Sequence, residues 1–235
     1  MPRLIVRSLL ALALIGCSGG KGAAATRAAA ASLQGAGAPA AAHDSTAALF
    51  AKADAARIMG SPAANVWLIV ISDFQCPFCK RWHDEAWAAI RKEYVETGKI
   101  RVAYVNLPLS MHRNAWPAAH AAMCAAVQGK FWELQDELFR AQKEWEDLAD
   151  PLPAFEGLAK NVGADAGAMR SCVNSSVMRP LIQSDVARAE NAGAQSTPTF
   201  FVGGKPLIGA QPLSAFREAI EAALAAPPSA KPAGK

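Results

Sequence analysis

The feature that most restricts the fold is an unbroken apolar run at residues 65–72 (NVWLIVIS), which leads directly into a pair of closely spaced cysteines. A run of this kind, rich in valine and isoleucine and without polar alternation, is typical of a strand that is covered on both faces of a sheet. Such a strand needs neighbouring strands and helices packed over them. The sequence therefore predicts an α/β protein built around residues 65–72.

A helix and a second strand are expected next. Residues 77–97 are predicted to be helical because apolar side chains recur four positions apart, at Phe78, Trp82, Ala86 and Ile90. Pro77 suits the first helical turn and Gly98 suits a helix end. Residues 99–109 (KIRVAYVNLPL) have the pattern of a second strand. A strand, a helix and a strand in this order predict a right-handed parallel crossover.

The rest of the folded region is expected to be a helical insertion followed by a hairpin and a last helix. Residues 112–193 contain several helical patterns and no convincing strand. Residues 197–209 (TPTFFVGGKPLIG) predict two short strands around a glycine pair. Residues 212–224 predict an amphipathic helix.

The N-terminal residues 1–16 have the layout of a secretory signal, with Arg3 and Arg7 ahead of a short apolar stretch. The sequence Leu-Ile-Gly-Cys at 14–17 resembles a bacterial lipobox, in which Cys17 would receive a diacylglycerol group and become the first residue of the mature chain. Ordinary cleavage nearby, with Cys17 lost or left as a free thiol, is the alternative. Both predict export to a space that permits disulfides.

Two segments are expected to lie outside the folded domain. Residues 17–45 are rich in alanine and glycine and predict a flexible tether, and residues 227–235 predict a disordered tail. The folded domain would then span residues 46–226. The 24 basic and 20 acidic residues are spread along the chain, so no nucleic-acid partner is expected.

The Cys76-Pro77-Phe78-Cys79 motif follows the predicted strand and opens the predicted helix. Unpaired backbone N–H groups and the helix dipole favour negative charge at such a position and lower the pKa of a thiol. Cys76 is therefore predicted to be the attacking sulfur. Cys79 lies one turn later and faces inward, which suits a resolving role.

Cys-x-x-Cys motifs also occur in zinc sites and in static disulfides. Zinc needs about four ligands, and His83 could be a third ligand only with its ring turned back along the helix. A static disulfide would stabilise little because the loop that it closes is minimal. No metal and no cofactor are expected, and a redox-active pair is favoured.

Three stretches of sequence together resemble the DsbA-like branch of the thioredoxin superfamily: SDFQCPFC, AAMCAAVQGKFWELQDELF and GAQSTPTFFVGGKPLIG. The resemblance covers about residues 59–224. It implies a thioredoxin-like fold with an inserted helical domain and an activity in thiol-disulfide exchange. It also implies that Thr197-Pro198 is a cis-proline turn facing the active site, where Thr197 backbone groups pair with a substrate strand. The residues alone say only that an X-Pro bond can be cis.

The chain departs from this family's pattern at two places. Many relatives have an acidic residue six positions before the first cysteine, where this chain has Val70. Proton transfer from Cys79 would then depend on water or on Asp73, although Asp73 could equally be a solvated turn residue or a cap. Pro77-Phe78 lacks a histidine donor to the Cys76 thiolate, which predicts a less extreme oxidant than members that have one.

The five cysteines leave an odd one, which lipidation of Cys17 explains. With Cys76 and Cys79 as the active pair, Cys124 and Cys172 remain, and a structural disulfide between them is predicted. Two buried free thiols are the alternative. His112 and His120 have the setting of surface or packing residues.

The function predicted from these features is donation of a disulfide to reduced or unfolded exported proteins. A membrane reoxidase linked to quinone, of the DsbB or VKOR kind, would restore the pair. The protein would be a monomer held on the cell envelope by its lipid, because the region before Ile58 is too short for a dimerisation domain. The alternatives are a thiol reductase, or a non-catalytic lipoprotein that binds a partner or a soft metal.

Overall fold

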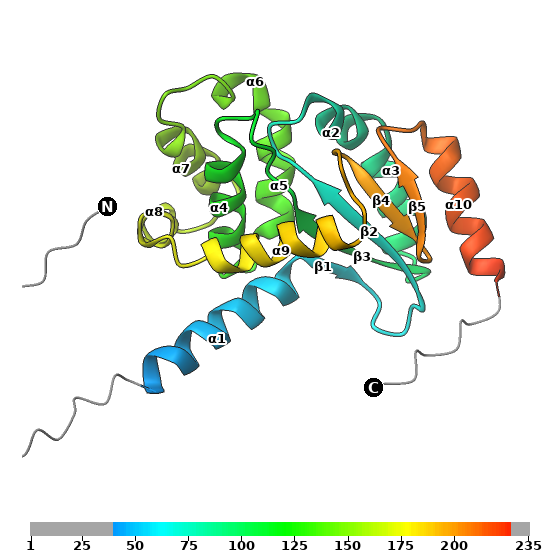
Figure 1. Cartoon of the computed structure of the whole chain (residues 1–235), viewed down its shortest axis with the longest axis horizontal. Coiled ribbons are helices and arrows are strands. Elements are labelled where there is room, and N and C mark those ends of the chain that lie inside the picture. The colour runs from blue at the N-terminus through cyan, green and yellow to red at the C-terminus, as the bar shows by residue number, and fades with distance from the viewer. Residues whose placement is uncertain (1–39, 227–235) are drawn as a thin grey trace, which may run out of the picture. The chain divides into compact units, whose positions relative to one another are not determined.

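The computed structural model describes residues 40–226, with side chains from residue 45 onward. They form a five-stranded mixed sheet in the order β1-β3-β2-β4-β5 (Figure 1). The strands are β1 (Ile58–Gly60), β2 (Val66–Ser72), β3 (Ile100–Asn106), β4 (Thr199–Val202) and β5 (Lys205–Ile208). The predicted α/β class is confirmed.

Strand β2 lies at the centre of the sheet, parallel to β3 and antiparallel to β4. Successive side chains of a strand point to opposite faces. Val70 therefore packs into the main core with Trp82, whereas Ile71 packs on the other face with Leu107 and Ala189. Burial on both faces explains why the run at β2 is apolar throughout.

The backbone after β2 is helical from Pro77 to Val95, as α2 (Pro77–Trp82), η1 (His83–Trp87), α3 (Ala88–Ile90) and η2 (Arg91–Val95). The two η segments are π-helical turns, which the apolar spacing does not reveal. Phe78 is 54% exposed at the start of this segment, and the buried face begins at Cys79.

The predicted insertion between β3 and β4 is entirely helical. It contains α4 (Ala115–Ala126), α5 (Phe131–Arg140), α6 (Gln142–Trp145), α7 (Leu152–Asn161), α8 (Ala166–Ser175) and α9 (Arg179–Asn191). Helices α4 to α8 gather beside the sheet, and α9 runs back across it (Figure 1). Asp165 caps α8 as its side chain accepts a hydrogen bond from the Ala168 N–H at 2.9 Å.

The C-terminal part forms the predicted hairpin and helix. Strands β4 and β5 pair antiparallel, with Val202 opposite Lys205. The turn between them is made by Gly203 and Gly204, whose φ angles of 54° and 85° are the conformation that a tight hairpin turn requires. Helix α10 (Leu213–Ala225) then buries Phe216 and Ile220.

Helix α1 (Ala40–Ala56) was not predicted, and it begins inside the stretch 17–45 that was expected to be a tether. Alanine has the highest helix propensity, so an alanine-rich segment can be helical without a wide apolar face. The rest of the tether, the signal 1–16, Cys17 and the tail 227–235 lie outside the described residues. Within 40–226 no helix combines the length and the apolar character that crossing a membrane requires.

A buried ion pair joins the end of α1 to β3 and α9. The Arg57 guanidinium donates to the Asp185 carboxylate and to the Tyr104 carbonyl oxygen, the latter at 3.1 Å. Asn106 Nδ2 donates to the same carboxylate at 2.8 Å. The side chains of Arg57 and Asp185 are 5% and 0% exposed. Arg57 also pairs with Asp54 and Asp185 with Arg188, but both of these partners are partly exposed. The contact between Arg57 and Asp185 is therefore the part of the cluster that is buried on both sides.

We expect Asp185→Ala to lower the free energy of unfolding by about 3 kcal/mol, because it removes the buried partner of Arg57 and leaves only the Asp54 carboxylate, which is 40% exposed. Glu93→Ala is the control, since Glu93 pairs with Arg217 at the surface and the loss should be below about 1 kcal/mol. Urea denaturation of both variants measures the difference. Equal losses would contradict this account of the Arg57 cluster.

Candidate functional site

The two cysteines lie where β2 passes into α2. Cys76 has an extended backbone (φ −68°, ψ 123°) and is the N-cap of α2, with Pro77 in the first turn. The turn is closed by the Cys76 N–H, which donates to the Asp73 carbonyl oxygen at 3.2 Å. Both Cys76 and Cys79 are free thiols, 3% and 0% exposed. Phe78 between them projects into solvent.

The Cys76 sulfur is surrounded by hydrogen-bond donors. A hydrogen bond from the Cys79 thiol is the main cause that lowers the pKa of Cys76 from 9.0 to about 6. The Thr197 hydroxyl and the backbone N–H groups of Phe78 and Cys79 act in the same direction, and burial opposes them. These N–H groups belong to the first turn of the helix, where they have no intrahelical acceptor. Cys76 can therefore be a thiolate near neutral pH.

The Cys79 thiol has the opposite tendency. Burial raises its pKa well above the ordinary value, and the neighbouring Cys76 raises it further. The Asp73 N–H lies 3.5 Å from the Cys79 sulfur. A neutral Cys79 that donates to a Cys76 thiolate is thus the favoured state of the reduced pair, and the two protons leave at well separated pH values.

The segment before β4 supplies the third side of the site. The Thr197-Pro198 peptide bond is cis. The Cys76 thiol lies 3.3 Å from the Thr197 carbonyl oxygen, within hydrogen-bond reach for sulfur. The structure thus brings Thr197 and Pro198 beside the cysteine pair. Thr197 is 121 positions from Cys76 in the sequence.

Asp73 is buried rather than solvated, with 1% of its surface exposed. Its carboxylate accepts hydrogen bonds from the Gln75 N–H at 2.7 Å and the Leu109 N–H at 2.9 Å, and it contacts His112 Nδ1 at 2.7 Å. Asp73 therefore holds the loop after β3 against the cysteine turn.

His112 is a site residue that the sequence interpretation undervalued. Its ring is only 17% exposed and contacts Asp73 directly. A signal was available, because β2 and β3 were predicted to be parallel and the carboxyl ends of parallel strands meet at one edge of a sheet. Loops that follow such strands are neighbours in space.

Cys124 of α4 and Cys172 of α8 form a disulfide with an S–S distance of 2.01 Å. The bond joins two helices of the insertion and closes a loop of 48 positions. In the chain-entropy model, a loop of this length corresponds to about 4 kcal/mol of stabilisation.

His83 does not face the cysteine pair as a third ligand would. Its Nε2 atom contacts the Asp136 carboxylate at 2.8 Å, on helix α5. Among the residues that the structure describes, no group of three or more His, Cys, Asp and Glu side chains is arranged to hold a metal ion.

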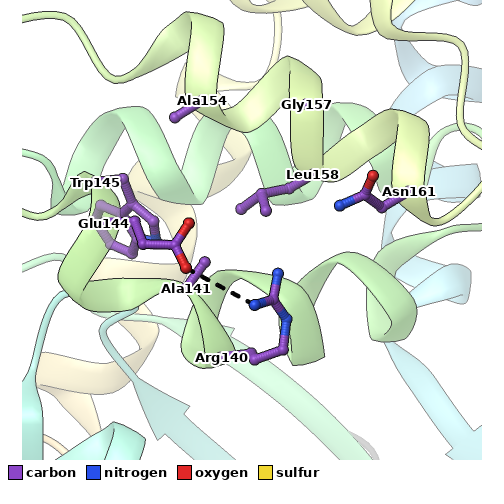
Figure 2. A pocket seen from close by; sticks show the side chains of 8 residues that line it. All are labelled: Arg140, Ala141, Glu144, Trp145, Ala154, Gly157, Leu158 and Asn161. Atoms are coloured by element: carbon purple, nitrogen blue, oxygen red, sulfur yellow. Dashed lines mark ion pairs between the residues drawn. The ribbon is translucent and has the colours of Figure 1, made fainter.

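A pocket of about 260 Å³ lies within the helical insertion, between the α5–α6 segment and α7 (Figure 2). Arg140 and Glu144 form an ion pair of 3.8 Å at its side. A second pocket, of about 470 Å³, is lined by residues such as Asn114, Pro117 and Phe155. No cysteine lines either pocket, so both are separate from the thiol pair.

The sheet order, the free cysteine pair at a strand-to-helix junction and the cis-proline beside it together define a thioredoxin-fold protein with a dithiol site. The family model described as "Thioredoxin" matches residues 52–222. The chain belongs to the thioredoxin family.

Two kinds of characterised protein are similar in sequence. The chain is 25% identical over 151 residues to "Probable disulfide bond formation protein D" of Bacillus anthracis, covering 62% of this chain and 69% of that protein. It is 32% identical over 173 residues to "Na(+)/H(+) antiporter NhaA 3" of Salinispora tropica, covering 73% of this chain. The chain spans about a quarter of the length of the antiporters that it matches, 25% in this case.

Solved structures of DsbA-like proteins share the fold. Oxidised BdbD from Bacillus subtilis superposes with a TM-score of 0.66 at 22% identity, covering 72% of this chain and 92% of that chain. Alpha-DsbA1 of Wolbachia pipientis gives 0.65 at 21% identity, covering 72% and 90%. The predicted thioredoxin-like fold with an inserted helical domain is confirmed.

We expect Cys79→Ala to raise the pKa of Cys76 from about 6 toward its ordinary value, because the variant removes the largest stabilising contact of the thiolate. The pH dependence of thiolate absorbance near 240 nm, followed in the reduced protein, measures this shift. Cys124→Ala together with Cys172→Ala is the control and should leave the titration of Cys76 in place. A Cys76 titration near pH 6 in Cys79→Ala would show that the helix N-terminus alone stabilises the thiolate.

Proposed function

We propose that this protein is a thiol-disulfide oxidoreductase that exchanges disulfides with other proteins through Cys76 and Cys79. The observation that carries the proposal is the free Cys76 thiol at the N-cap of α2, with buried Cys79 one turn later and the Thr197 carbonyl oxygen 3.3 Å from the Cys76 sulfur. This setting raises the pKa of Cys79 and lowers that of Cys76 to about 6. At pH 7 a thiol with this pKa is about ten parts thiolate to one part thiol. The name of the Bacillus anthracis relative supports the same chemistry.

Exchange in the direction of disulfide donation begins with a substrate thiolate that attacks Cys76. A new disulfide joins the substrate to Cys76, and Cys79 leaves as a thiolate. A second substrate thiolate then attacks the substrate sulfur of this mixed disulfide, and Cys76 leaves. A thiol of low pKa is a good leaving group, so the position of Cys76 favours release of an oxidised substrate.

The oxidase direction is our preferred form of the proposal. Contacts that stabilise the Cys76 thiolate stabilise the reduced pair, which makes the disulfide form a better oxidant. Pro77-Phe78 supplies no histidine donor, so a potential below that of the strongest oxidants is expected. A thiol reductase would use the same residues at a lower potential, and a binding protein without turnover is the remaining alternative.

Substrates in this proposal are unfolded or reduced proteins. Phe78 is 54% exposed next to Cys76 and offers an apolar contact to an extended chain. Backbone groups of Thr197, beside the cis-proline, would pair with the substrate strand. A membrane reoxidase of the DsbB or VKOR kind would regenerate the disulfide.

We further propose that the protein acts outside the cytoplasm as a lipid-anchored monomer. The support is the N-terminal sequence, with a signal at residues 1–16, Cys17 as the lipidated residue and an alanine- and glycine-rich segment before α1. The catalytic domain would be residues 46–226, and the tail 227–235 would take no part. Extracytoplasmic disulfide exchange is consistent with the disulfide between Cys124 and Cys172.

Trapping of mixed disulfides tests the proposal. Reduced Cys79→Ser protein, incubated with ribonuclease A whose disulfides have been scrambled, should accumulate a covalent complex through Cys76, because the resolving thiol is absent. Cys76→Ser should form none, and Cys124→Ala together with Cys172→Ala should behave as the unchanged protein. Non-reducing gels and mass spectrometry of the linked peptides give the result.

Two outcomes would contradict the proposal. Complexes that form through Cys79 in the Cys76→Ser protein would reverse the assigned roles. The absence of any complex, together with failure of the unchanged protein to exchange disulfides, would leave only the binding alternative.

A further inference from the structure

Two hydroxyl groups lie beneath the buried thiol of Cys79, on Ser72 and Tyr104. Tyr104 of β3 is the register partner of Val70 on β2, and Ser72 lies two residues after Val70. Residues two apart on a strand, and residues paired across strands, point to the same face of a sheet. The side chains of Ser72 and Tyr104 therefore share the face of the sheet on which Val70 packs with Cys79.

Both hydroxyls are buried and lack a hydrogen-bond partner among the described residues. Ser72 and Tyr104 are 2% and 1% exposed, and neither hydroxyl oxygen makes a hydrogen bond of normal geometry within the described residues. The Tyr104 ring is held in place, stacked on Phe74 at 5.2 Å and in edge contact with Phe131 at 5.2 Å. A buried hydroxyl without a partner lowers the stability of a fold, so its presence calls for another explanation.

The Cys79 sulfur belongs to the same buried cluster as Tyr104. It lies 3.5 Å from the Asp73 N–H, directly after Ser72 at the end of β2. Burial raises the pKa of both Cys79 and Tyr104, and the Ser72 hydroxyl lowers both. Together with the shared face of the sheet, this indicates that the Ser72 hydroxyl is within reach of both groups.

Among the described side chains, no Lys, Arg or His makes a hydrogen bond to the Cys79 sulfur. Val70, which packs on the same face of the sheet as Cys79, is apolar. The Asp73 carboxylate contacts His112, so it is not free to act on Cys79. A buried thiolate needs hydrogen-bond donors in place of a counterion. Neutral hydroxyl groups can supply them without adding charge to the core.

We propose that the Ser72 hydroxyl donates a hydrogen bond to the Cys79 sulfur whenever that sulfur is a thiolate, and that Tyr104 is a positioning residue whose hydroxyl donates to the Ser72 oxygen. Both hydroxyls reach these positions by rotation about single bonds. The inference rests on the proposed exchange reaction, and it names the groups that serve its buried sulfur.

The Cys79 thiolate occurs in both directions of exchange. When a substrate thiolate attacks Cys76, the Cys76–Cys79 bond breaks and its electron pair leaves on Cys79. In the reverse step Cys79 gives up its proton to solvent and attacks Cys76 in the mixed disulfide, and the substrate sulfur leaves with the electron pair. Donors at Cys79 lower the barrier of both steps but do not affect the attack by Cys76 on an external disulfide.

Stopped-flow reaction with 5,5′-dithiobis(2-nitrobenzoate) separates the two sulfurs. The full chain carrying Cys17→Ser is used, with the Cys76–Cys79 pair selectively reduced. The first release of nitrothiobenzoate reports attack by Cys76, and the second reports attack by Cys79 on the resulting mixed disulfide.

Ser72→Ala should slow the second release about tenfold or more and move its pH profile upward, since it removes a hydrogen bond to a charged group. Tyr104→Phe should act in the same direction with a smaller effect.

Controls separate this role from a structural one. Tyr94→Phe changes the chain's other tyrosine, which lies on η2, and should leave both releases unchanged. Ser72→Thr retains the hydroxyl and should restore the second release. A structural role would change the free energy of unfolding and would not shift the pH profile of the second release relative to the first.

The outcomes distinguish this inference from the proposed function. Normal second releases in both Ser72→Ala and Tyr104→Phe would overturn the role of the hydroxyls and leave the exchange reaction intact. Absence of the first release in the unchanged chain would instead reject the proposed function. If Ser72→Ala does not fold, Tyr104→Phe decides the inference alone. This variant removes only the Tyr104 hydroxyl and keeps the ring contacts with Phe74 and Phe131, so it should fold.

Discussion

The hydrogen bond from the Cys79 thiol to the Cys76 sulfur is the interaction on which the site depends. It exists because β2 ends in a turn that buries Cys79 completely and leaves Cys76 at the first turn of a helix. Burial keeps the proton on Cys79, and the proton in turn stabilises negative charge on Cys76. Two sulfurs that are both nearly buried and lie one helical turn apart thereby differ in reactivity, because the hydrogen-bond donors converge on Cys76.

Three segments that are distant in sequence maintain this difference. The turn after β2 carries the cysteines, the loop after β3 is fastened to that turn by Asp73 and His112, and the segment before β4 places Thr197 against Cys76. The parallel pairing of β2 with β3 and the antiparallel pairing of β2 with β4 bring all three to one edge of the sheet. The buried pair of Arg57 and Asp185 holds α9 and the end of α1 on this frame.

Much of the frame could be predicted because it follows from local patterns. The apolar run at β2, the hairpin glycines and the Cys-x-x-Cys spacing each constrain a few neighbouring residues. The parallel order of β2 and β3 indicates that the loops carrying Asp73 and His112 are neighbours, but the individual contacts of Asp73, His112 and Tyr104 depend on the register between the strands. The surroundings of the Ser72 hydroxyl could not be predicted either, because Ser72 is buried among residues of other strands and helices. Helix α1 was missed because its alanine-rich sequence has no apolar periodicity.

The reduction potential of the Cys76–Cys79 pair, measured by equilibration in glutathione buffers with Cys124 and Cys172 followed separately, tests the central claim most directly. If the stabilised Cys76 thiolate makes this protein a disulfide donor, the potential should fall at about −120 to −180 mV, toward the lower end because the motif lacks a histidine donor. A value near about −270 mV would mean that the same site serves reduction, and it would contradict the proposed direction of exchange.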